Sequence, residues 1–302
     1  SQAIAEFAQQ GFTAVWYDHV RVDDLRLGLG GEIPSAAIDK ALEKFSRKAR
    51  RKDNLQALDR MTELVDGRYR FRHDMPGLFP VAALPTEARP QHLRDEAESA
   101  LGEYRATLAD DRRWLLERYN LVDLALKVVG VGSVGTRCLV ALLQGRDSGD
   151  PLFLQAKEAN ASVLEEFLGP SPYENHGQRV VEGQRMVQAQ SDIFLGWSRT
   201  SVGRDFYIRQ LRDWKGSVDV ENPSIDGSRF YATLCGLTLA RGHARSGDPV
   251  AIAAYAGESD RLDKAIASFA ERYADQNEAD YAAFMQAIDD GRLEIAPPEP
   301  ES

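Results

Sequence analysis

The sequence predicts an α+β protein in which an antiparallel sheet of about five strands, with one inserted helix, packs with a mostly helical part. Two observations predict this class. Short apolar runs bounded by turn residues dominate residues 126–218, which is typical of strands. Apolar residues at helical spacing dominate residues 1–125 and 219–302. We therefore expect three parts with these bounds, the sheet being in the middle one.

Composition and charge restrict the function. The chain has 302 residues, of which 43% are hydrophobic and 28% charged, as in a soluble globular protein. It has no apolar run of the roughly 18 residues that a membrane helix needs and no charged-then-apolar leader, so we expect a cytoplasmic protein without a membrane partner. A net charge of -10 argues against binding to nucleic acid. Cys138 and Cys235 lack metal-ligand spacing, and we expect two reduced thiols.

The first part is expected to be largely helical. Ile4, Phe7 and Ala8 recur at helical spacing, and Ser35 is a candidate N-cap for a helix that reaches about Val65 and ends at Asp66-Gly67. Prolines between residues 68 and 92 predict an irregular segment with one short strand in the sequence YRFRH. Helical spacing returns at about residue 93 and continues to about residue 127.

Glycines at 130, 132 and 135 give the spacing G-x-G-x-x-G, which is typical of two unrelated phosphate-binding structures. In a dinucleotide-binding unit a helix follows the glycines, whereas in a kinase a second strand follows them and a third strand presents a lysine. The interval 136–144 is short for a crossover helix, because the turn sequence GRDSGDP follows at once. The sequence therefore favours the kinase arrangement.

That arrangement predicts the nucleotide-binding residues. Lys157 lies in the strand-like run LFLQAKEA, where alternation with Phe153 and Gln155 could direct it inward. A helix follows, and Glu182 is the first candidate to form an ion pair with Lys157, with Glu165 or Glu166 as alternatives. Two further strands would lead to a hinge whose backbone meets the adenine edge. The predicted nucleotide contacts are Gly130, Gly132, Ser133, Gly135, Lys157, Glu182, Gln210 and Leu211.

The last part is expected to contain a helix at about 228–246, then a pair of helices near 259–275 and 277–290. Tyr273, Tyr281 and Phe284 would lie on an inner face of that pair, and the tail PPEPES would be disordered. His243 and Asp248 do not have the spacing of a kinase catalytic loop. We expect no catalytic residue and no metal ligand in this chain.

Several segments together resemble the bacterial family called domain of unknown function 2252. They span nearly the whole chain and include VWYDHV, LLERYNLVDLALKVVGVGSVGTRC, GDPLFLQAKEA, QSDIFLGW, FYIRQLRDWKGS and LARGHARSGD. That family is thought to be similar to the protein-kinase-like superfamily, which includes the aminoglycoside phosphotransferases. The resemblance implies a circularly permuted kinase-like fold, ATP with Mg²⁺ as cofactor, and a phosphoryl acceptor that the sequence does not name.

The resemblance also limits the expected activity. Members of the family carry two acidic stretches, similar to a catalytic loop and a metal-binding loop, upstream of the part that matches this chain. We therefore expect the C-terminal portion of a kinase-like phosphotransferase, which binds nucleotide with negligible turnover and exposes apolar surface that favours self-association. The alternatives are a non-catalytic binding or regulatory module and a dinucleotide-dependent oxidoreductase, the latter excluded if residues 136–144 form a strand.

Overall fold

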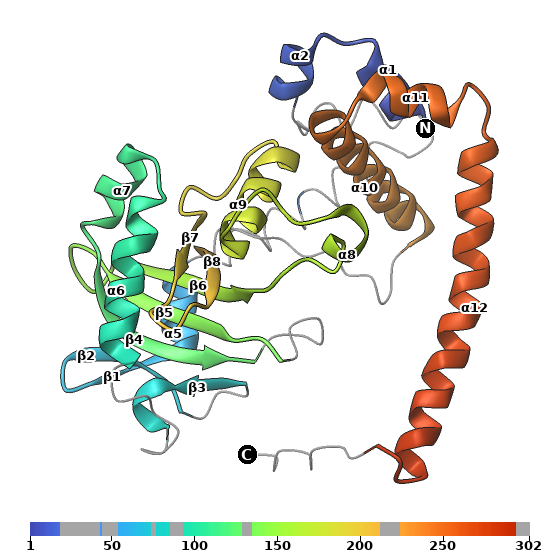
Figure 1. Cartoon of the computed structure of the whole chain (residues 1–302). Coiled ribbons are helices and arrows are strands. Elements are labelled where there is room, and N and C mark those ends of the chain that lie inside the picture. The colour runs from blue at the N-terminus through green and yellow to red at the C-terminus, as the bar shows by residue number, and fades with distance from the viewer. Residues whose placement is uncertain are drawn as a thin grey trace. The chain divides into compact units, whose positions relative to one another are not determined.

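The computed structural model describes two compact units. The described residues are 1–18, 43, 54–73, 77–84, 93–128, 135–211 and 224–293. Unit 1 comprises Ser1–Val15 and Leu239–Ser302, and unit 2 comprises Trp16–Thr238. The helices and strands of both units are labelled in Figure 1.

Unit 2 is built around a six-stranded antiparallel sheet with the order β3-β4-β5-β6-β8-β7 (Figure 1). Its strands are β3 (Leu78–Pro80), β4 (Asn120–Lys127), β5 (Cys138–Gln144), β6 (Pro151–Ala159), β7 (Gly196–Arg199) and β8 (Asp205–Gln210). The predicted α+β class is confirmed. Strands β5 to β8 lie where the sequence predicted strands, whereas β4 lies mostly in a segment expected to be helical, and β3 adds a sixth strand at one edge.

One face of this sheet, which we call the α6 face, is covered by α6 (Leu93–Ala106) and α7 (Asp110–Leu116). Tyr104 of α6 is fully buried there, and its hydroxyl donates a hydrogen bond to the carbonyl oxygen of Phe194. Burial raises the pKa of this phenol well above its usual value. The core of this face consists of Tyr104, Leu108, Leu116, Leu143, Leu152, Leu154, Phe194 and Ile208.

The opposite face, the α5 face, is covered by α5 (Asn54–Met61) and by a hairpin of β1 (Thr62–Val65) and β2 (Arg68–Phe71). Buried Asp123 of β4 accepts the backbone N–H of Phe71 at 2.9 Å, which ties the hairpin to the sheet. The core of this face consists of Ala57, Leu58, Met61, Phe71, Leu78, Ala125, Val140, Leu142 and Phe153.

The hairpin corrects one expectation. The helix expected to reach Val65 ends at Met61, and Thr62–Val65 is a strand paired with Arg68–Phe71. Asp66 and Gly67 have φ of 49° and 75°, the left-handed backbone that a tight two-residue hairpin turn requires. The Asp-Gly pair therefore marks a hairpin and not a helix end. The strand expected in YRFRH is confirmed as β2, while the expected start of the helix at Ser35 lies outside the described residues.

A second correction concerns the segment that precedes the glycines. The helical segment expected to continue to about residue 127 ends at Leu116, and β4 begins at Asn120. The apolar run of β4 suits a helix as well as a strand, so pairing with β3 and β5 decides its conformation. The helices α6 and α7 share a core with the sheet, and the expected boundary at 125/126 falls inside β4.

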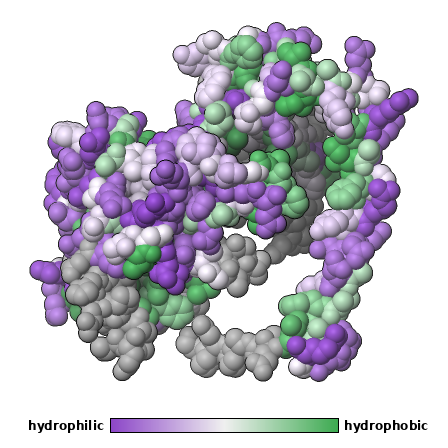
Figure 2. Space-filling model, viewed as in Figure 1, coloured by the Kyte–Doolittle hydropathy of each residue, from purple (hydrophilic) through white to green (hydrophobic). Residues whose placement is uncertain are grey.

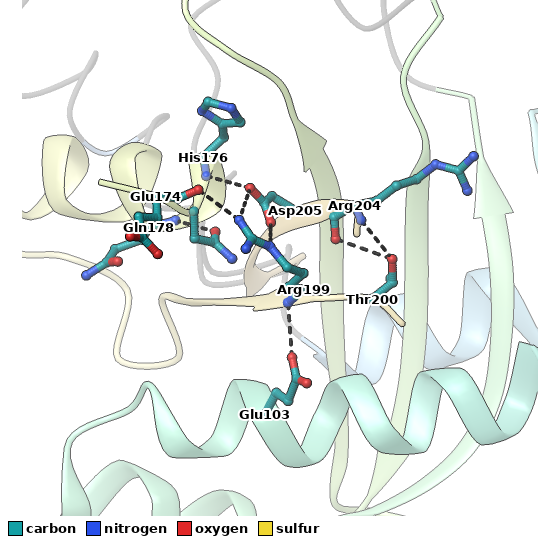
Figure 3. A network of polar contacts seen from close by, with 9 residues as sticks. Glu103, Glu174, His176, Gln178, Arg199, Thr200, Arg204 and Asp205 are labelled. Carbon is teal, nitrogen blue, oxygen red and sulfur yellow. Dashed lines mark hydrogen bonds and ion pairs between the residues drawn. The ribbon is translucent and has the colours of Figure 1, made fainter. Parts of the chain in front are cut away.

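Two helices connect β6 to β7, namely α8 (Glu165–Leu168) and α9 (His176–Val187). Figure 3 shows the network that fixes the start of α9 on the sheet. Buried Asp205 of β8 accepts the backbone N–H of His176 at 2.8 Å, and Arg199 Nη2 donates to the carbonyl oxygen of Glu174 at 2.8 Å. Ile208 of β8 lies in the core of the α6 face, so alternation along the strand places Asp205 on the α5 face. The helix α9, which Asp205 holds, therefore lies on the α5 face beside β8 and β7.

Unit 1 has its own small core, formed by Ile4, Phe7, Val15, Ala240 and Ala244. Its elements are α1 (Gln2–Ala8), the start of α2 (Phe12–Tyr17), the end of α10 (Ile225–Ser246), α11 (Pro249–Ala256) and α12 (Arg261–Asp289). The two helices expected near 259–275 and 277–290 are one continuous helix, because no glycine or proline interrupts α12. The tail expected to be disordered lies outside the described residues.

None of the helices among the described residues combines the length and the apolar character that crossing a bilayer would require.

Candidate functional site

Lys157 lies on the α5 face of the sheet, on the strand between β5 and β8. It is directly opposite Cys138 of β5 and Tyr207 of β8. Opposite residues of an antiparallel pair place their side chains on the same face, so the ammonium group shares its face with the Cys138 thiol and the Tyr207 ring. Lys157 is partly buried in this position.

Three cationic side chains, Lys127, Lys157 and Arg209, lie near enough to the Cys138 thiol to affect its pKa, and we call them the cationic cluster. Burial raises the pKa of this thiol, while the charges of Lys157, Lys127 and Arg209 and a hydrogen bond from Gln155 act in the opposite direction. Burial outweighs them, so the pKa is raised. All three cations are therefore close enough to act on one sulfur atom, although they come from three different strands.

Gln155 holds the centre of the cluster in place. It is only 4% exposed, and its Nε2 donates to the Cys138 sulfur at 3.3 Å. Arg209 lies opposite Gln155 in the register, and its Nη2 donates to Gln155 Oε1 at 3.5 Å. The Nε of Arg209 is buried without a hydrogen-bond partner among the described residues. The Arg209 guanidinium therefore retains an unused donor inside the protein.

Lys157 and Arg209 carry charges that the described part of the chain does not neutralise. Other arginines of unit 2 form close ion pairs, as Arg137 does with Glu158 at 3.1 Å and Arg199 with Asp205 at 2.6 Å. Among the described residues, no carboxylate lies within 4.0 Å of the Lys157 or Arg209 nitrogens. A partly buried cation without a counter-charge is costly, and an anion would lower that cost.

The glycine segment connects β4 to β5 in the sequence. Gly130, Gly132 and Ser133 lie outside the described residues. Gly135 has a φ of +82°, which favours glycine, and a Cβ added there would meet no atom of the described residues within 4 Å. The chain is anchored as it enters β5, because the backbone N–H of Arg137 donates to Glu158 Oε2 at 2.9 Å. That anchor adjoins Lys157 in β6.

Glu182 does not form the expected ion pair with Lys157. Its carboxylate accepts Arg185 Nη1 at 3.0 Å, one helical turn along α9. The helix directs fully buried Val181 into the protein and leaves Glu182 beside Arg185, whose Nη2 donates to the carbonyl oxygen of Leu195 at 2.8 Å. The two alternative glutamates do not form an ion pair with Lys157 either. The Glu165 carboxylate accepts a hydrogen bond from the backbone N–H of Ser162 at 3.0 Å, and Glu166 is exposed.

The proposed hinge residues already use their backbone donors. The N–H of Gln210 donates to Asp192 Oδ2 at 2.6 Å, and the N–H of Leu211 donates to the carbonyl oxygen of Phe153 at 2.9 Å. These two N–H groups are therefore occupied by the protein itself. Contact with an adenine edge would have to involve other backbone groups, and the described chain stops at Leu211 before resuming at residue 224.

Comparison with known proteins identifies the family. A family model described as "Uncharacterized protein conserved in bacteria (DUF2252)" matches residues 1–287. The chain belongs to the DUF2252 family. No curated protein and no solved structure matches the chain. In this DUF2252 protein, both the glycine segment and the cationic cluster fall within the matched residues.

The structure of this DUF2252 protein contradicts the dinucleotide-binding alternative. It also brings to the candidate site residues that the sequence did not single out. Cys138–Gln144 is a strand, so no crossover helix follows the glycines and the dinucleotide-binding arrangement is excluded. The candidate site contains, in addition to Lys157, the residues Lys127, Cys138, Gln155 and Arg209. Arg209 could have been found from alternation with Tyr207 along β8. Within the described residues there is no group of three or more His, Cys, Asp or Glu that could hold a metal ion.

Proposed function

We propose that unit 2 is the nucleotide-binding lobe of a kinase-like phosphotransferase, with Lys157 as the principal phosphate ligand. One observation carries the proposal. Lys157 lies opposite Cys138, the first residue of the strand that follows the glycine segment. No carboxylate of the described residues forms an ion pair with the Lys157 ammonium group. The strand, glycine loop, strand, turn and lysine strand follow one another in the order that a kinase small lobe requires.

The electrostatics of the cluster support a phosphorylated ligand. Ammonium and guanidinium groups are the side chains that bind phosphate oxygens most strongly in proteins, and arginine adds planar, directional donors. Lys157 supplies a point charge opposite Cys138 of β5, and Arg209 supplies a guanidinium whose Nε has no hydrogen-bond partner among the described residues. Backbone N–H groups of residues 130–135 would supplement them, as in other glycine-rich phosphate loops.

The residues present fit the phosphates of ATP but not its Mg²⁺. Phosphates need cations and N–H donors, and the cluster provides both. Mg²⁺ prefers carboxylate and water oxygens, and the described residues contain no cluster of acidic side chains that could bind it. Bound ATP would supply the transferable phosphoryl group, and the residues of this chain would hold and orient it. We therefore assign these residues to binding and name no catalytic residue or acceptor.

Calorimetry with ATP and ADP, each with Mg²⁺, tests the proposal on the whole chain. We expect binding that Lys157→Ala weakens at least about tenfold, which corresponds to about 1.4 kcal/mol. Arg146→Ala is the matched control, because Arg146 lies in the turn at the other end of the β5–β6 hairpin and pairs only with Asp147 among the described residues. Failure of the folded wild-type chain to bind, or equal affinity of Lys157→Ala and wild type, would contradict the proposal.

A second candidate is a non-catalytic nucleotide-binding or regulatory module. The Glu182–Arg185 pair favours it, since the lysine-orienting carboxylate of a kinase is engaged elsewhere. The two candidates differ in turnover and not in binding. Phosphate release from ATP that exceeds the rate of the Lys157→Ala variant would support the phosphotransferase, whereas saturable binding with no such release would support the module.

A further inference from the structure

The long helix α12 has an apolar stripe that no described residue of unit 1 covers. None of its 29 residues is buried. Helices of globular proteins are stabilised mainly by packing of an apolar face, so such a stripe on a long helix indicates a partner. Figure 2 shows apolar side chains at the surface of this helix. The large exposed ones are Ile266, Phe269, Tyr273, Tyr281, Phe284 and Met285.

The stripe is symmetric about Asn277. Tyr273 and Tyr281 lie four residues on either side, Phe269 and Met285 lie eight, and Ile266 and Ile288 lie eleven. Steps of three and four residues keep these side chains on one side of the helix. Between Ile266 and Ile288 the stripe is about 33 Å long at 1.5 Å per residue. A surface that repeats itself in reverse order can pack against its own copy in antiparallel orientation.

Side-chain size is also complementary in that orientation. Ala270 and Phe284 lie seven residues on either side of Asn277, so each phenyl ring would face a methyl group of the other copy. Phe269 and Tyr273 stack within one helix, with ring centroids 5.6 Å apart and an angle of 16° between the planes. This pair presents a flat aromatic surface to Tyr281 and Met285 of a second copy.

Charge decides between antiparallel and parallel pairing. Before Asn277, α12 carries the basic residues Arg261, Lys264 and Arg272 and the acidic residues Asp263, Glu271 and Asp275, so this half has no net charge. After Asn277, all charged residues of the helix and its C-cap are acidic, namely Glu278, Asp280, Asp289 and Asp290. Parallel pairing would place the two acidic halves side by side, which is unfavourable, whereas antiparallel pairing places each acidic half against a half that has no net charge.

We propose that α12 is the self-association surface of this protein and pairs with α12 of a second copy, antiparallel, about a two-fold axis at Asn277. The two Asn277 amides meet at this axis, where each can donate to the other. A polar pair inside an apolar helix interface fixes the register, because any shift would bury the amides unpaired. This inference uses only unit 1 and is independent of the nucleotide proposal.

Sedimentation of the whole chain tests the pairing. We expect a monomer–dimer equilibrium that Phe269→Glu shifts at least about tenfold toward monomer, since it would place a carboxylate against Met285 of the other copy. Ser268→Glu is the matched control. It adds the same charge one residue away, about 100° around the helix and outside the stripe, and leaves the dimer intact. Unchanged circular dichroism verifies that both variants fold.

Disulfide cross-linking tests the orientation. In a Cys235→Ser background, with Cys138 only 3% exposed, Asn277→Cys should form a cross-linked dimer under mild oxidation. Phe269→Cys alone should not, whereas a mixture of Phe269→Cys and Met285→Cys should. A wild-type chain that stays monomeric up to about 100 µM overturns the proposal. Cross-linking of Phe269→Cys with itself, indicating a parallel pair, also overturns it.

Discussion

Arg199 and Asp205 are directly opposite each other in β7 and β8 and form a bidentate ion pair, with Nε 2.6 Å from Oδ1 and Nη2 3.1 Å from Oδ2. The same carboxylate accepts the first backbone N–H of α9 (Figure 3). Burial acts to raise the pKa of Asp205, but the hydrogen bonds from Arg199 and His176 outweigh burial and lower it. One ionised side chain thus holds two strands and a helix together.

Asp205→Asn should destabilise unit 2 at neutral pH by about 1–3 kcal/mol, because it removes the charge that Arg199 and the His176 N–H stabilise. A carboxyl whose folded pKa is lowered stabilises the protein above its unfolded pKa, and this contribution disappears as the pH falls through the folded pKa. The difference between wild type and variant should therefore shrink below about pH 4. Urea unfolding at several pH values measures it, and equal stability at pH 7 would contradict the expectation.

Gly177→Ala should disrupt the contact between α9 and β8. A Cβ at this position would lie 2.2 Å from the carbonyl oxygen of Phe206, a backbone atom that cannot move alone. We expect a loss of about 1–3 kcal/mol or more in the free energy of unfolding. Gly183→Ala in the same helix is the control. Its Cβ would meet nothing within 4 Å, and it should stabilise by about 0.5–1 kcal/mol. The same sign for both variants would be inconsistent with this packing.

Gly135→Ala should cost about 1–2 kcal/mol of stability, because alanine disfavours the φ of +82° found there. No described atom lies within 4 Å of the added Cβ, so we expect the cost to arise from the backbone conformation. Asn tolerates left-handed backbone better than other residues, and Gly135→Asn should therefore lose less. Thermal unfolding of the two variants measures the difference. If Asn is the more destabilising replacement, crowding and not conformation governs this position.

Tyr119 should make unit 2 sensitive to alkaline pH. Burial, followed by the hydrogen bond that its hydroxyl donates to Asp150 Oδ1 at 2.9 Å and the charge of Asp150, raises its pKa to about 12. A phenol whose folded pKa is raised stabilises the protein below its unfolded pKa, and this stability is lost as the pH rises from about 10 through about 12. Tyr119→Phe should cost about 0.5–1.5 kcal/mol at neutral pH and less at high pH. Chemical unfolding at pH 7 and near pH 11 compares them.

Local signals determined much of this fold. The turn sequence between Gln144 and Pro151 and the alternation on either side of it correctly predicted the β5–β6 hairpin, and the two further strands expected before the hinge are β7 and β8. These signals succeed because a turn and a period of two residues depend on neighbours in sequence. The same reasoning failed at residues 62–65, where the local pattern suits a helix and the strand is decided by pairing with Arg68–Phe71.

The sequence by itself determined that Lys157 shares a face with Gln155 and Phe153, since strand alternation is a local property. Only the tertiary structure decided which charges gather around it. Arg209 joins the cluster because β8, and not its predecessor β7, lies beside β6. Val181 packs inside the protein and thereby sets the rotation of α9 about its axis. In this rotation Glu182 forms its ion pair with Arg185. Strand order and helix rotation depend on how distant apolar surfaces fit together, and short segments of sequence do not encode that fit.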